Sequence, residues 1–480
     1  MNTRDWSRAP ITRRTTLAAA LLAPALARAQ ERQTMLHDLA RRAAIYLFPV
    51  CEMYRTRWNA TVNEANPVRG KLNRFLHVPA LATHKSRAVT TPNTDTLYSS
   101  AWLDLSLEPL FLTVPAMGER YYNFAFMSLF TDNFAYVCRR LDGGRPRPRM
   151  IVGPAWQGVA PSEVELVRSP TNGVWLLGRI LVDGPDDLSA VRALQGKTLL
   201  ETPDMRNERR ILETEELMRQ RNTLPPQAVA DWPAPNRADP FDLFAVGLRA
   251  LGESPLGERD RAVMESFADL KLRPGRKFDA RAFSESERTE IQAGIAEAEA
   301  EIRAAGKRYG QTVNGWNYPA RNLGNFGDDY LYRAVIALTA LAALETAEAT
   351  YLSCTSDEAG RPLDGSSRYV VRFEPRQLPP AKAFWSLTMY EVTPEGRAFF
   401  TDNPISRYAI GDRTKGLRVG PDGALEIYVQ YERPTADKEP NWLPAPAAGP
   451  IRLLLRAYEP QEALLDGRYR LPPVRRNSPP

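Results

Sequence analysis

The sequence predicts an α+β protein in which two antiparallel β-rich domains, of sandwich or jelly-roll type, are bridged by a helical segment. Short β-prone runs separated by turn signals fill residues 89–200 and again 350–475. Helix-period patterns and helix caps fill the stretch between them. Strand-rich stretches separated by a helical one are typical of α+β architecture. The expected organisation is a signal peptide at 1–29, a helix plus N-terminal β-rich domain at 30–200, a helical connection at 201–350 and a C-terminal β-sandwich-like domain at 351–475.

The first 29 residues have the pattern of an export signal. Arginines precede an apolar run at residues 17–27, about 11 residues long and too short to span a bilayer. Residues 27–29 fit a small-residue cleavage site, with the cut before Gln30. Arg13-Arg14 indicates the twin-arginine route, and an ordinary secretory signal is the alternative. We therefore expect a periplasmic or secreted protein, cleaved near Ala29, with no stable membrane insertion afterwards.

The charge balance does not favour a nucleic-acid partner. The chain carries +6, but residues 1–29 hold five arginines and one aspartate, which leaves the remainder near +2. The densest basic patch, residues 139–149, contains glycine and prolines and is expected to be an exposed loop. The most apolar later stretch, residues 334–349, contains Glu345 and Glu348 and predicts a buried helix of a globular domain.

The cysteines and histidines argue against a metal or redox centre, and no cofactor is expected. Three cysteines without a CxxC pattern allow one disulfide and a free thiol, or three buried thiols. A histidine metal site would have to draw on His37, His77 and His84 alone. No GxSxG pattern marks a hydrolase nucleophile.

The helices are expected where apolar spacing and caps agree. Apolar residues recur at helical steps over residues 35–60, and 186–194 predicts a short helix. Asp239-Pro240 is a helix start, and Ser284 begins a capping box before a charged helix ending near Lys307. Asp328-Asp329 suits the N-terminus of the helix that follows.

The strands are expected where apolar and polar residues alternate between turn signals. The clearest runs are 110–114, 121–126, 369–373, 384–390, 425–429 and 451–455. Residues 421–423 form a hairpin-type turn, and the tail from Arg475 is expected to be disordered.

Several segments resemble two families. Residues 92–104, with 168–172 and 177–184, resemble the domain of unknown function 1254. Residues 362–365, 384–390, 407–414 and 436–444 resemble the domain of unknown function 1214. The resemblance implies two β-rich domains bridged by helices, commonly in exported bacterial proteins, and it supplies no catalytic residues.

Asn93, Asp95 and Tyr98 are the first candidate site residues. Asn and Asp two apart can close an Asx-type turn, or they can stand at a pocket rim with Tyr98 and bind a polar ligand. Arg407 and Arg413 flank Asp412, either as a structural fork or for anion recognition.

Trp442 and Asp132 complete the candidates. Trp442 is either a sugar-stacking platform or part of a core edge. The aromatic series at 121–136 favours a core face, and Asp132 interrupts it.

Two functional hypotheses follow, and a structural envelope protein without a ligand is a third. The first is a protein that binds a small polar molecule or glycan in an inter-domain or sheet-face pocket, with contacts from Asn93, Asp95, Tyr98, Arg407, Arg413 and Trp442. The alternative is a metal-independent enzyme, a glycan hydrolase or lyase, with Asp95 and Asp132 as acid and base. The paired-carboxylate form requires the two groups within about 10 Å of each other.

Overall fold

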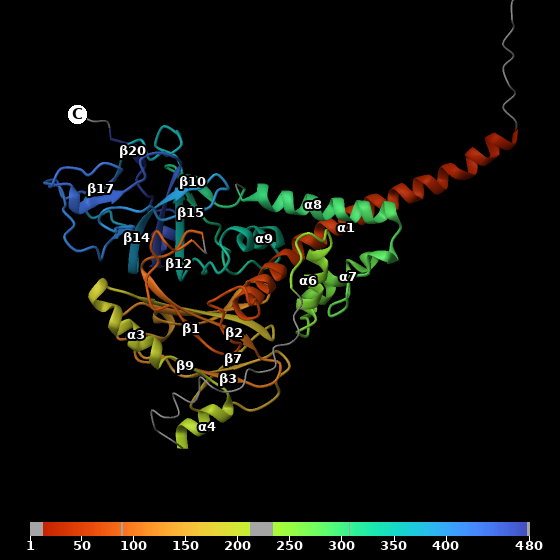
Figure 1. Cartoon of the computed structure of the whole chain (residues 1–480), viewed down its shortest axis with the longest axis horizontal. Helices are drawn as coiled ribbons and strands as arrows, with labels where there is room; N and C mark the ends of the chain where they lie inside the picture. Colours follow the sequence, from red (N-terminus) through yellow and green to blue (C-terminus); the bar gives the residue numbers. More distant parts are fainter. Residues whose placement is uncertain (1–12, 88–89, 212–233, 307, 478–480) are drawn as a thin grey trace, which may run out of the picture.

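The chain is dominated at its start by one long helix. The computed structural model describes residues 13–87, 90–211, 234–306 and 308–477, and α1 (Arg13–Thr61) projects from the body at its N-terminal end (Figure 1). The helix predicted at 35–60 is the buried part of α1, from Leu36 to Tyr54. Of the predicted signal segment, residues 1–12 lie outside the described residues and 13–29 belong to α1.

The bridging helices pack around α1 in a common apolar core. This layer contains α6 (Asp242–Leu251), α7 (Glu258–Glu265), α8 (Glu285–Ala305), α9 (Tyr330–Thr339) and the short 3-10 helices Ala268–Leu270 and Ala280–Ala282. The capping box at Ser284 is confirmed, and Asp329 caps α9 by accepting from the Tyr332 amide. The helical segment is therefore part of the packed body.

The helix expected at 334–349 is wrong in its second half. It ends at Thr339, Ala342 takes a left-handed φ of 69°, and Ala349 begins a strand. Glu348 is fully buried and its carboxylate binds Arg140 from the N-terminal domain. A tertiary ion pair thus overrides the local helical preference of this stretch.

The N-terminal domain consists of two packed sheets, as far as the described residues go. An antiparallel sheet has the order β1 (Leu76–His77), β2 (Thr96–Asp104), β8 (Gly173–Leu181), β4 (Tyr122–Ser128), β5 (Asn133–Cys138). The second has the order β7 (Glu165–Arg168), β6 (Arg149–Val152), β3 (Leu110–Thr113), β9 (Leu199–Glu201), with β6 and β7 parallel. Helices α2 (Arg139–Asp142), α3 (Leu188–Lys197) and α4 (Pro203–Ile211), with the 3-10 helix Pro185–Asp187, complete the domain.

The basic patch at 139–149 is an exposed loop only in its middle part, where Arg145 and Arg147 are exposed, and not at its two ends. Arg139 and Arg140 lie in α2, and Arg149 is buried in β6, where it binds Asp142. Arginine side chains with carboxylate partners are compatible with such burial.

The C-terminal domain is a sandwich, as expected. One sheet contains β10 (Gln311–Val313), β11 (Trp316–Tyr318), β12 (Ala349–Cys354), β19 (Ile451–Pro460), β14 (Ala381–Val392), β15 (Ala398–Phe399) and β16 (Ala409–Gly411). The other has the order β18 (Trp442–Pro444), β17 (Leu425–Gln430), β13 (Tyr369–Phe373), β20 (Val474–Arg476). The short helix α10 (Glu462–Leu465) and the 3-10 helix Glu439–Asn441 complete it.

Three further details complete the outline. Arg475 and Arg476 pair with β13 in β20, so the tail predicted to be disordered is ordered at its start. Cys51, Cys138 and Cys354 are buried free thiols. No helix among the described residues is long and apolar enough to cross a bilayer.

The face of the N-terminal antiparallel sheet that turns away from β3 and β6 is shared between α1 and the C-terminal domain. Alternate residues of β2, β4 and β8 point to this face. Some of them join the helical core and others join an apolar cluster with the C-terminal domain. That cluster includes Tyr121, Phe384 and Tyr458, whose rings are 4.2 to 5.5 Å apart between centroids.

Candidate functional site

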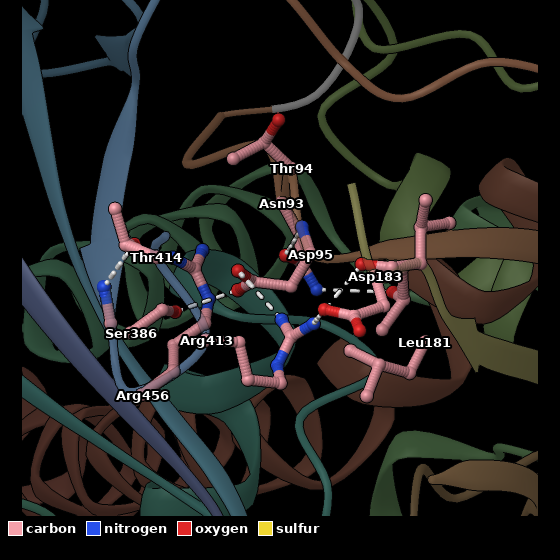
Figure 2. A network of polar contacts seen from close by, with 12 residues as sticks. Asn93, Thr94, Asp95, Leu181, Asp183, Ser386, Arg413, Thr414 and Arg456 are labelled. Carbon is pink, nitrogen blue, oxygen red and sulfur yellow. Dashed lines mark hydrogen bonds and ion pairs between the residues drawn. The ribbon is translucent and has the colours of Figure 1, made fainter. Parts of the chain in front are cut away.

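The segment Asn93 to Asp95 closes a turn and also reaches across the domain boundary. The side-chain oxygen of Asn93 accepts the Asp95 amide at 2.7 Å, so the Asx-type turn is present. The side-chain amide of Asn93 donates to the Tyr458 hydroxyl at 2.9 Å, and the Ser386 hydroxyl donates to Asp95 Oδ2 at 2.6 Å. Figure 2 shows the Asp95 carboxylate between Ser386 and Arg413. The turn thus aims polar side chains at the C-terminal domain.

A polar row crosses the N-terminal sheet beside this segment. Tyr98 on β2 is the cross-strand partner of Arg179 on β8, and Arg179 is in turn the partner of Asn123 on β4. Arg179 and Asn123 are buried, and the Arg179 guanidinium carbon lies 5.3 Å from the Tyr98 ring centre. We call Tyr98, Arg179 and Asn123 the N-terminal row.

A matching row crosses the C-terminal sheet. Tyr351 on β12 pairs with Arg456 on β19, and Arg456 pairs with Ser386 on β14. The buried guanidinium of Arg456 donates to the Thr388 and Tyr390 hydroxyls at 3.0 and 2.8 Å. We call Tyr351, Arg456 and Ser386 the C-terminal row.

The two polar rows lie within electrostatic reach of each other. Burial alone would raise the pKa of Tyr98, but Arg179, the hydrogen bond from Asn93 and Arg456 outweigh it, so this pKa is lowered. Burial raises the pKa of Tyr351, although Arg179 and Arg456 oppose the change. The arginines of each row therefore lower the pKa of tyrosines in both rows. Only at Tyr98, among the two tyrosines, does this effect exceed the effect of burial and favour the phenolate.

Some buried polar atoms of the N-terminal row have no hydrogen-bond partner among the described residues. Within the described part of the chain, neither the oxygen nor the nitrogen of the fully buried Asn123 side-chain amide has a partner. Nη1 of Arg179 is also buried and makes no hydrogen bond of good geometry to any described residue, although the guanidinium lies within hydrogen-bonding reach of the Tyr98 hydroxyl. Buried polar groups are normally paired, so adjacent unmet groups point to a binding partner outside the chain.

Arg413 lies at the edge of the polar rows, near Asp95. Its guanidinium stacks on Phe384 at 4.5 Å, donates to the Val182 carbonyl at 3.1 Å and lies 4.0 Å from Asp95 Oδ1. Burial raises the pKa of the neighbouring Asp412, whose side chain accepts the Trp385 amide. Arg413 therefore joins the predicted site.

Arg407 and Trp442 do not join it. Arg407 donates to the carbonyls of Glu439, Pro440 and Trp442 at 2.9 to 3.0 Å, and burial lowers its pKa. The Trp442 indole is buried and donates to Gln430 at 2.8 Å. Nη1 of Arg407 and the indole N–H of Trp442 both donate to backbone carbonyls and hold the loop before β18 in place, away from the polar rows.

Asp132 lies at the other end of the sheet from Asp95. Asp95 precedes Thr96, which pairs with Leu181, whereas Asp132 follows Ser128, which pairs with Val174. Seven residues of strand correspond to roughly 23 Å. Asp132 binds Arg333 and the Phe326 amide instead. The expected pairing of Asp95 and Asp132 as acid and base is therefore wrong.

A surface pocket opens beside the 93–95 segment. It has a volume of about 480 Å³ and takes walls from both domains: Leu81, Ala82, Thr83, His84, Lys85, Thr94, Ser406 and Tyr408. His84 lies 2.9 Å from the Tyr408 hydroxyl and 3.3 Å from Asp402. Thr94 lines the pocket while its neighbours Asn93 and Asp95 turn inward, so this segment separates the pocket from the polar rows. No cluster of three or more metal-ligating side chains occurs among the described residues.

Sequence reasoning missed Arg179, Asn123, Tyr351, Arg456 and Ser386 as site residues. The available signal was an arginine flanked by apolar residues inside a strand, as at Arg179 in β8 and Arg456 in β19. A buried arginine of this kind requires a specific polar environment.

The comparisons with known proteins agree with this architecture. The model of the family described as "Protein of unknown function (DUF1254)" matches residues 72–202, and that of "Protein of unknown function (DUF1214)" matches residues 348–462. The chain therefore has a two-domain architecture, with the DUF1254 domain N-terminal and the DUF1214 domain C-terminal, as its motifs implied.

One solved structure shares the fold, and a second was compared. The crystal structure of the VPA0106 protein from Vibrio parahaemolyticus has a TM-score of 0.70 at 23% identity, covering 92% of this chain and 100% of that chain. An uncharacterized protein from Burkholderia cenocepacia has a TM-score of 0.42 at 13% identity, covering 95% and 97%. The comparison with curated proteins found no match.

Proposed function

We propose that the protein is exported and binds a small polar molecule between its two domains, at the polar rows. The observation that carries this proposal is that buried polar atoms of Asn123 and Arg179 lack hydrogen-bond partners in the described part of the chain. Both residues lie on the face of the N-terminal antiparallel sheet that meets the C-terminal domain. An unpaired buried amide costs roughly 1–3 kcal/mol, which is a reason to expect a ligand that satisfies it. The burial of the rows favours a small molecule over a glycan chain.

The surface pocket supports the same proposal. Its volume of about 480 Å³ falls within the range of small-molecule sites, and its walls come from both domains. Thr94 lines the pocket, and its neighbours Asn93 and Asp95 contact Tyr98 and Ser386 of the rows, so we propose that a ligand first occupies the pocket and then reaches the rows past this segment.

A substitution of Asn123 tests the proposal. The purified protein is screened by thermal shift and native mass spectrometry against metabolites and oligosaccharides. Asn123→Leu removes the unmet amide, so the free protein should be at least as stable as wild type, while the ligand-induced shift in melting temperature should disappear.

The matched control is Asn441→Leu. Asn441 is equally buried, but its side chain makes three hydrogen bonds, to Arg418 N, Arg418 O and Glu426 O, at 2.8, 2.6 and 2.8 Å. This variant should lose about 1–3 kcal/mol of stability and keep the ligand-induced shift. A full ligand-induced shift in Asn123→Leu would show that the rows are not the binding site.

A metal-independent enzyme of the lyase type is the second candidate. The observation that favours it is the lowered pKa of Tyr98 beside Arg179 and Arg456, because a phenolate can accept a proton from a substrate. We do not propose the hydrolase form with Asp95 and Asp132, because these two residues lie at opposite ends of the sheet. Mass spectrometry of the bound compound separates the two candidates: an unchanged mass supports binding alone, and a new product mass supports catalysis.

A further inference from the structure

The polar rows contain more buried positive than negative charge. Arg179 and Arg456 are each about 95% buried, at 5% and 4% exposure. In the described part of the chain neither donates a hydrogen bond to a carboxylate: Arg179 donates to the Ala342 carbonyl, and Arg456 to hydroxyls and the Thr91 carbonyl.

Asp95 and Glu348, two buried carboxylates near the rows, are already engaged. Asp95 accepts from Ser386 and lies beside Arg413, and Glu348 is bound by Arg140 and by the Tyr121 hydroxyl. Buried charges are normally compensated. The excess of cations therefore selects a negatively charged ligand.

We propose that the small molecule bound at the polar rows is an organic monocarboxylate, held between Arg179 and Arg456 beside Tyr98. This inference rests on the proposed function and names its ligand class. Guanidinium groups bind carboxylates through paired charge-assisted hydrogen bonds, and the unmet Nη1 of Arg179 offers a donor for one of them. The side-chain amide of Asn123, next to Arg179 in the row, supplies a further donor.

Binding of the carboxylate should be coupled to protonation of Tyr98. Without the ligand, the phenol of Tyr98 is the group nearest to Arg179 that can supply negative charge, and its pKa is lowered for this reason. A bound carboxylate brings its own negative charge, opposes the phenolate and raises the pKa of Tyr98 again. Two arginines face Tyr98, Arg179 on β8 and Arg456 on β19. The other charged and titratable groups around it are Tyr351 on β12, Tyr458 on β19 and Asp95, which precedes β2. Tyr121 lies behind these groups and interacts with Arg179 and Tyr458, and Glu348 interacts in turn with Tyr121.

The sign of the pH dependence follows. At a pH above the pKa of Tyr98 in the free protein, each carboxylate bound takes up one proton. The affinity therefore falls about tenfold per pH unit in that range, until the pH passes the pKa of the complex. Below the pKa of Tyr98 in the free protein, Tyr98 is protonated in both states, so its ionisation no longer changes the affinity with pH.

The experiment is isothermal titration calorimetry of the purified protein with monocarboxylates from acetate to benzoate, each beside its neutral amide, and with inorganic phosphate. Repeating the titrations in buffers of different ionisation enthalpy gives the number of protons taken up. We expect at least one carboxylate to bind about tenfold or more tightly than its amide, with uptake of about one proton at alkaline pH.

Three variants make the test specific. Tyr98→Phe should abolish proton uptake and with it the fall in affinity at alkaline pH, whereas Tyr122→Phe should behave as wild type, because Tyr122 faces the opposite side of β4 and donates to the Gly143 carbonyl. Arg179→Gln should lose the preference for the carboxylate over its amide. If Tyr98→Phe fails to fold, an ultraviolet titration of the wild-type tyrosinate band with and without benzoate reports the same pKa change.

The outcomes separate this inference from the proposed function. Equal binding of a carboxylate and its amide, tighter binding of phosphate, or carboxylate binding without proton uptake would each overturn the inference. A neutral ligand whose binding depends on Asn123 would overturn it while leaving the proposed function intact. Absence of any ligand for the rows would overturn both.

Discussion

At the scale of single residues, the Asp95 carboxylate joins the two domains. It accepts the Ser386 hydroxyl at 2.6 Å and lies 4.0 Å from Arg413, in a region where Arg456 is also buried. A negative charge at this place offsets positive charge that has little access to water. Asp183 contacts the same Arg413 from the surface, at 3.4 Å.

Replacement of Asp95 should therefore destabilise the fold. Asp95→Ala leaves the Ser386 hydroxyl and two arginines without this partner, and we expect a loss of about 1–3 kcal/mol in the free energy of unfolding. Asp183→Ala is the matched control, because its side chain is 59% exposed; we expect a change within about 0.5 kcal/mol. Urea denaturation measures both, and equal effects would contradict a special role for Asp95.

At the scale of elements, α1 and α8 approach closely at a glycine. A β-carbon at Gly294 would lie 2.3 Å from the His37 carbonyl oxygen and 3.0 Å from the Ala40 side chain. The neighbouring atom is backbone of a buried helix, so it has little freedom to move.

Gly294→Ala should accordingly destabilise the protein by about 1–3 kcal/mol, against the usual benefit of alanine in a helix. Gly196→Ala in α3 is the control: no atom lies within 4 Å of a β-carbon there, and a gain of about 0.5–1 kcal/mol is expected. Chemical denaturation of the two variants should give opposite signs; a gain at position 294 would show that the helices can separate without cost.

The same helix pair carries a pH-sensitive contact. His37 on α1 lies 2.7 Å from Glu297 and 3.1 Å from Glu290 on α8, and these hydrogen bonds raise its pKa despite partial desolvation. A raised pKa in the folded state means that protonated His37 stabilises the fold. This contribution is fully present below the unfolded value of about 6.5 and is lost as the pH rises through the folded value.

His37→Gln should then cost stability mainly at acidic pH. The difference in unfolding free energy between wild type and variant is expected to be largest between about pH 5 and 6.5, and to shrink in alkaline buffer. Denaturant midpoints measured across this range provide the comparison. A difference that does not change with pH would mean that the ring contributes by packing alone.

At the scale of the whole molecule, the two domains share an apolar cluster and a buried ion pair. Tyr121 and Cys138 from one domain pack with Phe384 and Tyr458 from the other. Glu348, fully buried, accepts from Tyr121 and Arg140. The polar rows therefore lie in an interface with its own apolar core.

We expect the described body to unfold in a single calorimetric transition for this reason, with equal calorimetric and van't Hoff enthalpies. Glu348→Ala should lower the transition temperature through a loss of about 1–3 kcal/mol, because it leaves the Tyr121 hydroxyl without its acceptor and removes one of the two carboxylates that bind Arg140. Glu358→Ala, which removes an exposed pair with Arg475, should change stability by at most about 1 kcal/mol. Two well-separated transitions in the wild type would contradict the coupling.

The sequence by itself determined the elements whose signals are local. Alternation predicted β13 and the cores of β14, β17 and β19, and the capping box at Ser284 predicted the start of α8. It also marked Asn93, Asp95, Tyr98 and Arg413, which do lie together. Each of these signals depends on side chains near in the chain, so a linear pattern is sufficient.

Only the tertiary structure decided which polar residues meet. It placed Asp132 at the far end of the sheet, used Arg407 and Trp442 to hold a loop, and ended α9 early so that Glu348 could bind Arg140. It also brought Arg179 of one sheet within reach of Tyr351 of the other. The physical reason is that strand order and sheet packing set these distances, and a buried charge is stable only where the fold supplies its partners.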